Sequence, residues 1–99
     1  MRSVILEEVP SGRMFIGGEW VGNASGRSFP TFNPATGEVL GQAPLADATD
    51  GDRAVRAAHQ AFPGWSETPD PERARALRAL AAALRSHREE LAHLDALNS

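Results

Sequence analysis

Residues 14–21, MFIGGEWV, decide the fold of the first half of the chain. Two short runs of β-forming residues, 14–16 and 19–21, flank the pair Gly17 and Gly18. Because glycine adopts positive φ at little cost, this pair suits the two-residue turn of a β-hairpin. The stretch therefore predicts an antiparallel hairpin.

A second pair of strands is expected downstream, at residues 28–33 and 38–43. The segment between them, NPATG at residues 33–37, has the composition of a turn, with Pro34 suited to its second position. Pro30 cannot donate a backbone hydrogen bond, so its strand should lie at a sheet edge or begin after the proline. Residues 13–46 are thus predicted to form a small antiparallel β unit.

Residues 47–99 are rich in Ala, Leu and Arg and predict a helical unit. Thr49 is the expected N-cap of its first helix, with Asp52 three residues later and Asp50 in the first turn. An apolar stripe follows at helical spacing: Ala54, Val55, Ala58 and Phe62. Pro63 and Gly64 are expected to end this helix.

A second helical stretch should begin with Asp70 as N-cap and Pro71 in the first helical position. One side of it carries Leu77, Leu80, Leu84, Leu91 and Leu94. Ser86 and Glu89 have the spacing of a capping box, which favours a break near Ser86 and two consecutive helices.

Composition limits the function classes. The 99 residues are 41% hydrophobic and 23% charged, which is typical of one globular domain. A net charge of −3 argues against a nucleic-acid partner. No apolar run is long enough to cross a membrane, and Glu7 and Glu8 interrupt any signal peptide. We expect a cytoplasmic chain with a flexible tail at residues 1–12.

No motif for catalysis stands out. The glycines form neither a P-loop nor a dinucleotide-binding fingerprint, and the absence of cysteine excludes a catalytic thiol in this chain. Helix capping, rather than calcium binding, accounts for the acids at residues 47–52. Three histidines lack metal-site spacing and two tryptophans are expected to fill a core or an interface: His59, His87, His93, Trp20 and Trp65.

The order of the motifs resembles the opening of the aldehyde dehydrogenase superfamily. FIGGEWV at residues 15–21 precedes FNPATGEVL at 32–40, and a Phe-x-x-Trp motif at 62–65 precedes a Glu-Arg helix from Glu72. The likeness covers roughly residues 14–99. It implies an α/β fold class (α+β when the segment is taken alone) in which residues 13–99 form the first part of the coenzyme-binding domain.

The resemblance implies an NAD(P)-dependent oxidoreductase that converts an aldehyde to a carboxylate. The family's nucleophilic Cys, its general-base Glu and its cofactor loops would all follow position 99. We therefore assign no catalytic or cofactor-binding residue here, and expect the chain alone to be inactive and to bind neither NAD nor NADP. Its expected partner is the remainder of an aldehyde dehydrogenase chain, or a full-length relative.

Some family members hold a monovalent cation near their first strands. The matching positions are Thr31, the backbone carbonyl of Phe32, and Asn98 in place of an Asp. Oxygen donors suit such a cation, but the neutral Asn should weaken the site. The usual role of Asn at helix ends favours the plainer interpretation, in which Thr31 is an ordinary strand residue and Asn98 a helix terminator.

Two further interpretations remain open at this stage. The chain could be a stand-alone interaction module that docks its leucine side on a partner. It could also be a non-functional remnant of the family.

Overall fold

Strands β1 (Met14–Ile16) and β2 (Glu19–Val21) form the predicted first hairpin in the computed structural model, which describes residues 12–99. The strands pair antiparallel, with Phe15 opposite Trp20. Gly17 and Gly18 both have positive φ, at 63° and 82°. The turn prediction is therefore confirmed, for the conformational reason that the glycine pair indicated. Residues 1–11, which hold most of the predicted tail, lie outside the described residues.

The second hairpin joins β3 (Ser28–Phe32) to β4 (Val39–Pro44). Its turn is closed by the Gly37 N–H, which donates to the Asn33 carbonyl at 2.7 Å, and Gly37 has a φ of 77°. Pro30 lies within β3 opposite Gln42. Since this sheet has two strands, β3 keeps one unpaired edge and tolerates the missing N–H, as predicted.

Helix α2 (Ala48–Glu67) begins two residues earlier than predicted. Asp47, not Thr49, is the N-cap: its carboxylate accepts the Asp50 N–H at 3.1 Å, while the Asp50 carboxylate accepts the Asp47 N–H at 3.0 Å. This reciprocal pair is a capping box built from two aspartates. Thr49 therefore lies inside the first turn.

The prediction that Pro63 and Gly64 end α2 is wrong, because the helix continues through both to Glu67. Pro63 has no N–H to donate to the backbone carbonyl four residues earlier. Because the helix is exposed here, water can hydrate that carbonyl instead. Downstream, the Ser66 hydroxyl donates to the Pro63 carbonyl, at 2.9 Å. The helix ends where Pro69 forces Thr68 into the extended region, at ψ 130°.

Helices α3 (Asp70–Ser86) and α4 (Arg88–Asn98) confirm the predicted break near Ser86. Two details of their ends are wrong. Pro69 is the N-cap of α3 and Asp70 its first residue, one position from the prediction. The capping box of Ser86 and Glu89 does not form, because the Ser86 hydroxyl donates back to the Ala83 carbonyl at 2.9 Å and His87 occupies the cap position.

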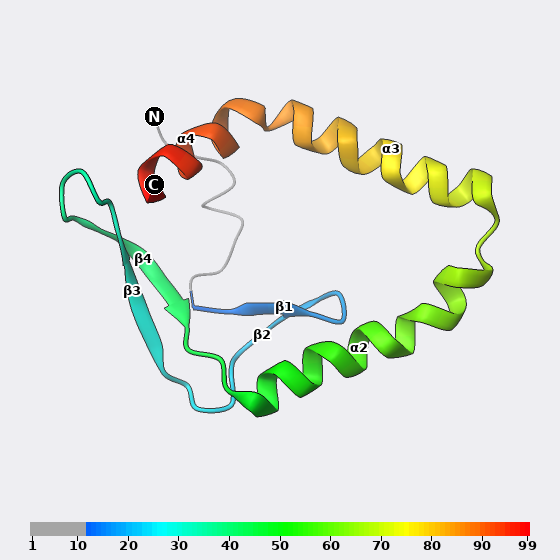
Figure 1. The fold of residues 1–99 in the computed structure, drawn as a ribbon, viewed down its shortest axis with the longest axis horizontal. Helices are drawn as coiled ribbons and strands as arrows, with labels where there is room; N and C mark the ends of the chain where they lie inside the picture. Colours follow the sequence, from blue (N-terminus) through cyan, green and yellow to red (C-terminus); the bar gives the residue numbers. More distant parts are fainter. Residues whose placement is uncertain (1–11) are drawn as a thin grey trace.

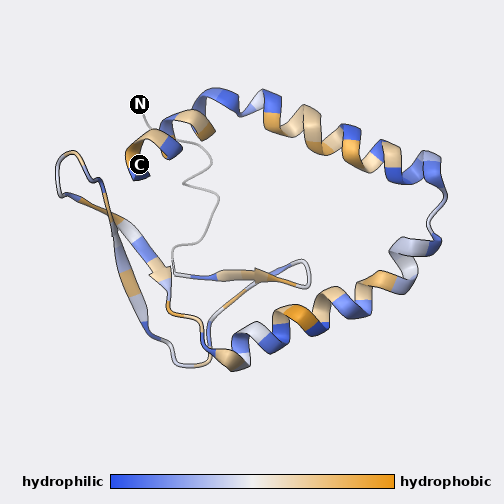
Figure 2. Cartoon of the chain, in the orientation of Figure 1, coloured by the Kyte–Doolittle hydropathy of each residue, from blue (hydrophilic) through white to orange (hydrophobic). Residues whose placement is uncertain are grey.

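The elements are arranged as an open ring in Figure 1, with the two hairpins on one side and α2 and α3 spanning the other. Hydrophobic and hydrophilic residues alternate along the helices in Figure 2, and no hydrophobic side chain of residues 12–99 is buried. The accessible surface is 7530 Å², against about 5,500 Å² for a compact monomer of this mass. The apolar sides of the helices therefore stay exposed and form no core within the described residues.

The two tryptophans illustrate this exposure. Trp20 stacks at a tilt on Phe15, with ring centroids 4.9 Å apart, yet 41% of its surface stays exposed. Trp65 is 47% exposed. Neither fills a core among residues 12–99. Within that range, no helix has the length and apolar character needed to cross a bilayer.

Candidate functional site

The most constrained polar group is Asp50, at the corner where the strands give way to α2. Its side chain is 1% exposed, and it is the one buried residue among residues 12–99. One carboxylate oxygen accepts the Ala24 N–H at 2.9 Å and the other accepts the Asp47 N–H at 3.0 Å. Hydrogen bonds to the ionised form stabilise it. The N–H of Asp47 holds the pKa of Asp50 below its ordinary value; Ala24 and Arg53 act in the same direction, and burial opposes them.

From the sequence, Asp50 is expected only as an acid in the first helical turn. The spacing of Asp47 and Asp50 was the available signal, since an acid three residues after an N-cap can complete a capping box. The bond to Ala24 had no such signal, because it joins positions 26 residues apart.

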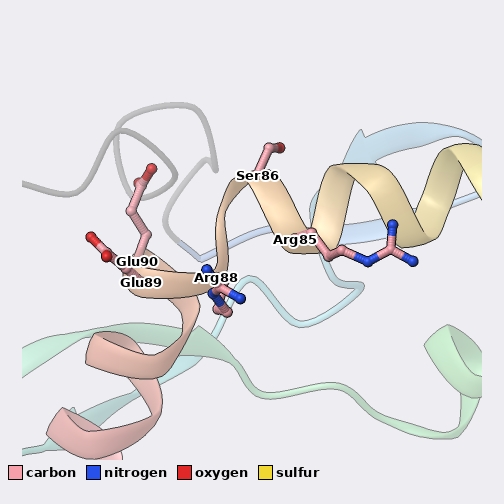
Figure 3. Close-up of a pocket in the computed structure, with 5 residues that line it drawn as sticks. All are labelled: Arg85, Ser86, Arg88, Glu89 and Glu90. Atoms are coloured by element: carbon pink, nitrogen blue, oxygen red, sulfur yellow. The ribbon is translucent and has the colours of Figure 1, made fainter.

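A surface hollow lies at the junction of α3 and α4. It is lined by Arg85, Ser86, Arg88, Glu89 and Glu90. In Figure 3, the Arg85 side chain extends away from those of Glu89 and Glu90, so the charged groups do not converge on one point. His87 lies beside this hollow, with Nδ1 3.3 Å from a Glu90 carboxylate oxygen. The two arginines and two glutamates that line the hollow carry no net charge together, so the hollow favours ions of neither sign.

A second hollow lies between the β1–β2 turn and the middle of α2. Its walls are small or uncharged: Gly17, Gly18, Ala54, Ala57, Ala58, Gln60 and Ala61. A Cβ added at Gly17 would lie 3.9 Å from the Ala57 Cβ, so the turn approaches the helix closely. This hollow holds no nucleophile, acid or base, and so no catalytic group.

The predicted cation ligands are only partly brought together. Thr31 and Phe32 are neighbours on β3, and the Thr31 hydroxyl donates to the Gly41 carbonyl at 3.4 Å. Asn98 lies at the end of α4, where its amide nitrogen donates to the Leu94 carbonyl at 2.8 Å. In residues 12–99, no hydrogen bond connects Asn98 to β3. The lone pairs of the Thr31 hydroxyl and the side-chain oxygen of Asn98 suit a hard cation chemically, so the donor set fits.

No other metal site emerges from this part of the chain. Among the described residues, no three side chains of His, Asp or Glu gather closely enough to hold a metal ion. Asp47 and Asp50 cap α2, with Asp47 rather than the predicted Thr49 in the leading position, and Asp52 pairs with Arg56 instead. The described residues thus contain an ordered polar corner and exposed apolar faces, but no constellation for bond chemistry.

Comparison with known proteins explains this combination. The model of the aldehyde dehydrogenase family matches residues 20–99. Malonate-semialdehyde dehydrogenase 1 of Geobacillus thermodenitrificans is 48% identical over 85 residues, which is 86% of this chain and 18% of that protein. A second such enzyme from the same organism is 43% identical over 94 residues, or 95% of this chain and 20% of the relative.

Solved structures of aldehyde dehydrogenases contain the same fold as this chain. The NAD+ complex of an aldehyde dehydrogenase from Bacillus cereus superposes with a TM-score of 0.88 at 40% identity, covering 98% of this chain and 21% of that one. A betaine aldehyde dehydrogenase variant from Staphylococcus aureus in complex with NAD+ gives 0.86 at 34% identity, covering 98% and 20%. The chain spans about a fifth of the length of these relatives, and it contains no cysteine to serve as the family's nucleophile. The chain belongs to the aldehyde dehydrogenase family, whose N-terminal segment it matches.

Proposed function

We propose that the chain acts as a structural segment of a cytoplasmic NAD(P)-dependent aldehyde dehydrogenase, an enzyme that oxidises an aldehyde to a carboxylate. The observation that carries this proposal is the open ring of amphipathic elements. It matches about a fifth of an aldehyde dehydrogenase structure with a TM-score of 0.88, while burying no hydrophobic side chain among residues 12–99. Large exposed apolar surface on a folded segment marks a contact with another protein part. The partner is the remaining polypeptide of the enzyme, or a full-length relative.

In this proposal the chain helps to build the fold of the enzyme and supplies no reacting or cofactor-binding group. The thiolate that attacks the aldehyde and the groups that hold NAD or NADP belong to the remaining four fifths of the enzyme. An activated nucleophile and a positioned oxyanion site are both needed for this reaction. The free chain is therefore expected to reduce no NAD or NADP when mixed with an aldehyde.

A chimeric enzyme tests the proposal. The 85 aligned residues of the G. thermodenitrificans malonate-semialdehyde dehydrogenase are replaced by the matching residues of this chain. We expect a folded enzyme whose kcat/KM for malonate semialdehyde lies within about tenfold of the parent, since in this proposal the substituted part supplies no reacting group. NADH formation, followed by its absorbance, measures the activity.

Two controls make the result decisive. The truncated relative, lacking the 85 residues, should be insoluble or inactive. The free 99-residue chain should give no NADH. A soluble chimera without activity would contradict the proposal, and a free chain that unfolds in one sharp cooperative transition would favour a stand-alone module instead.

We also propose that Thr31, the Phe32 carbonyl and Asn98 supply oxygen ligands to a monovalent cation in the complete enzyme. The support is the chemistry of the donors and the free lone pairs of the Thr31 hydroxyl described above. We expect the chimera to melt a few degrees higher in potassium or sodium chloride than in tetramethylammonium chloride. The Thr31→Val variant should lose this difference, whereas Thr36→Val, on the β3–β4 turn, should keep it; equal melting in all three salts would contradict the site.

A further inference from the structure

The corner between the strands and α2 is ordered without apolar packing. No hydrophobic side chain of residues 12–99 is buried, and Asp50 is the one buried group in that range. The β1–β2 hairpin meets α2 mainly through small side chains near its turn. The direction in which α2 leaves the strands must therefore be set largely by polar contacts.

Asp50 connects two parts of the chain that are distant in sequence. One carboxylate oxygen accepts the Ala24 N–H, from the loop at residues 22–27, at 2.9 Å. The other accepts the Asp47 N–H, at the start of α2, at 3.0 Å. Both bonds are charge-assisted, and such bonds are stronger than bonds between neutral groups.

Neighbouring groups reinforce the same connection. The Arg53 guanidinium lies 3.6 Å from the Asp50 carboxylate and donates to the Gly22 carbonyl at 3.4 Å. The Asn23 amide donates to the Leu45 carbonyl at 2.8 Å, just before the helix. The loop is thus held to the end of β4 and to the first turn of α2.

We propose that Asp50 is a positioning residue, the latch that fixes α2 to the strand hairpins through its bond to the loop at residues 22–27. Its hydrogen bond to the Asp47 N–H caps the helix, as such a bond would at the start of any helix. Its hydrogen bond to the Ala24 N–H, by contrast, joins α2 to the loop at residues 22–27. The latch is a property of the 99-residue chain itself and does not depend on the function proposed above.

Amide hydrogen exchange of Ala24 in the 99-residue chain tests the latch. In Asp50→Asn, one oxygen becomes an NH2 group that faces a backbone N–H, and the charge is lost. We expect the exchange of the Ala24 amide to accelerate at least about tenfold, the size expected for the loss of a hydrogen bond to a charged group.

Two matched variants separate the latch from helix capping and from charge. Asp47→Ala removes the other half of the capping box but leaves the Asp50 carboxylate and the Ala24 N–H in place. Asp52→Asn makes the same chemical change at an exposed acid two residues away, whose partner is Arg56. Both variants should leave Ala24 exchange within about twofold of the parent, although Asp47→Ala should speed exchange in the first turn of α2.

Either of two results would overturn the latch. One is an equal acceleration at Ala24 in Asp47→Ala and Asp50→Asn, because capping alone would then explain it. The other is an Ala24 amide that already exchanges at its intrinsic rate in the parent chain.

Discussion

Replacing Leu77, Leu80 and Leu84 together by alanine is expected to reduce the activity of the chimeric enzyme more than 100-fold, while α3 of the free chain keeps its helical content. In the free chain these side chains are 61%, 56% and 52% exposed, so removing them costs little there. Alanine also has the highest helix propensity. The two molecules therefore respond differently to the same substitutions.

The large effect expected in the chimera follows from the proposed burial of these leucines in the assembled enzyme. Each Leu→Ala change at a buried position costs about 2–5 kcal/mol. Three such losses are comparable with the roughly 5–15 kcal/mol that stabilises a whole domain. The chimera should lose its fold, and with it both soluble yield and NADH formation.

Arginines on the same helix provide the matched control. Helical geometry places Arg75, Arg78 and Arg85 away from the leucine side of α3. Their combined replacement by alanine should leave the chimera within about threefold of its starting activity. If the leucine variant retains full activity, these leucines do not form the docking face.

Acidification is expected to abolish the stabilisation that the Asp50 carboxylate gives to the contact between the loop at residues 22–27 and α2. The pKa of Asp50 is lowered from its ordinary value of 3.8, chiefly by the N–H of Asp47. Because the folded form binds the proton less readily than the unfolded form, the carboxylate contributes its stabilisation fully above that ordinary value. The contribution decreases as the pH falls through the lowered pKa, so the corner should be intact at pH 6 and released in strong acid.

The Ala24 amide proton reports this transition in NMR spectra recorded across the acid range. The charged groups in contact with Asp50 are Arg53 and Asp47, and the Asp47→Ala variant removes the second of them. Asp52→Asn should titrate like the parent at Ala24. Asp50→Asn should show no transition at this amide, and a parent-like curve there would contradict the assignment.

Local chemistry explains which elements could be predicted from the sequence. The first hairpin depends on Gly17 and Gly18, and the second turn on Gly37, because positive φ is a requirement of single residues. The order of motifs in residues 15–40 was equally informative and indicated the family. These features do not depend on distant contacts.

Helix ends were less predictable because several residues compete for each role. Thr49 and Asp47 both suit an N-cap, and the reciprocal bond with Asp50 selects Asp47. A proline inside a helix usually ends or kinks it. In α2 the exposed backbone tolerates Pro63, and Pro69 determines where the helix ends. The bond between Asp50 and Ala24 could not be predicted at all, because no periodicity relates positions 26 residues apart. The cation ligands Thr31, Phe32 and Asn98 stay a prediction.

The exposed apolar faces have a consequence for biosynthesis. In an enzyme of the relatives' length, this segment leaves the ribosome first, and the remaining four fifths follow at roughly 5–20 residues per second. The segment would then wait about 20–80 s for the polypeptide that covers it. During that time its aromatic side chains, such as Phe15 and Trp65, and the unpaired edges of its strands are open to chaperones and to neighbouring nascent chains. A tightly held corner at Asp50 would reduce the number of conformations available to such encounters.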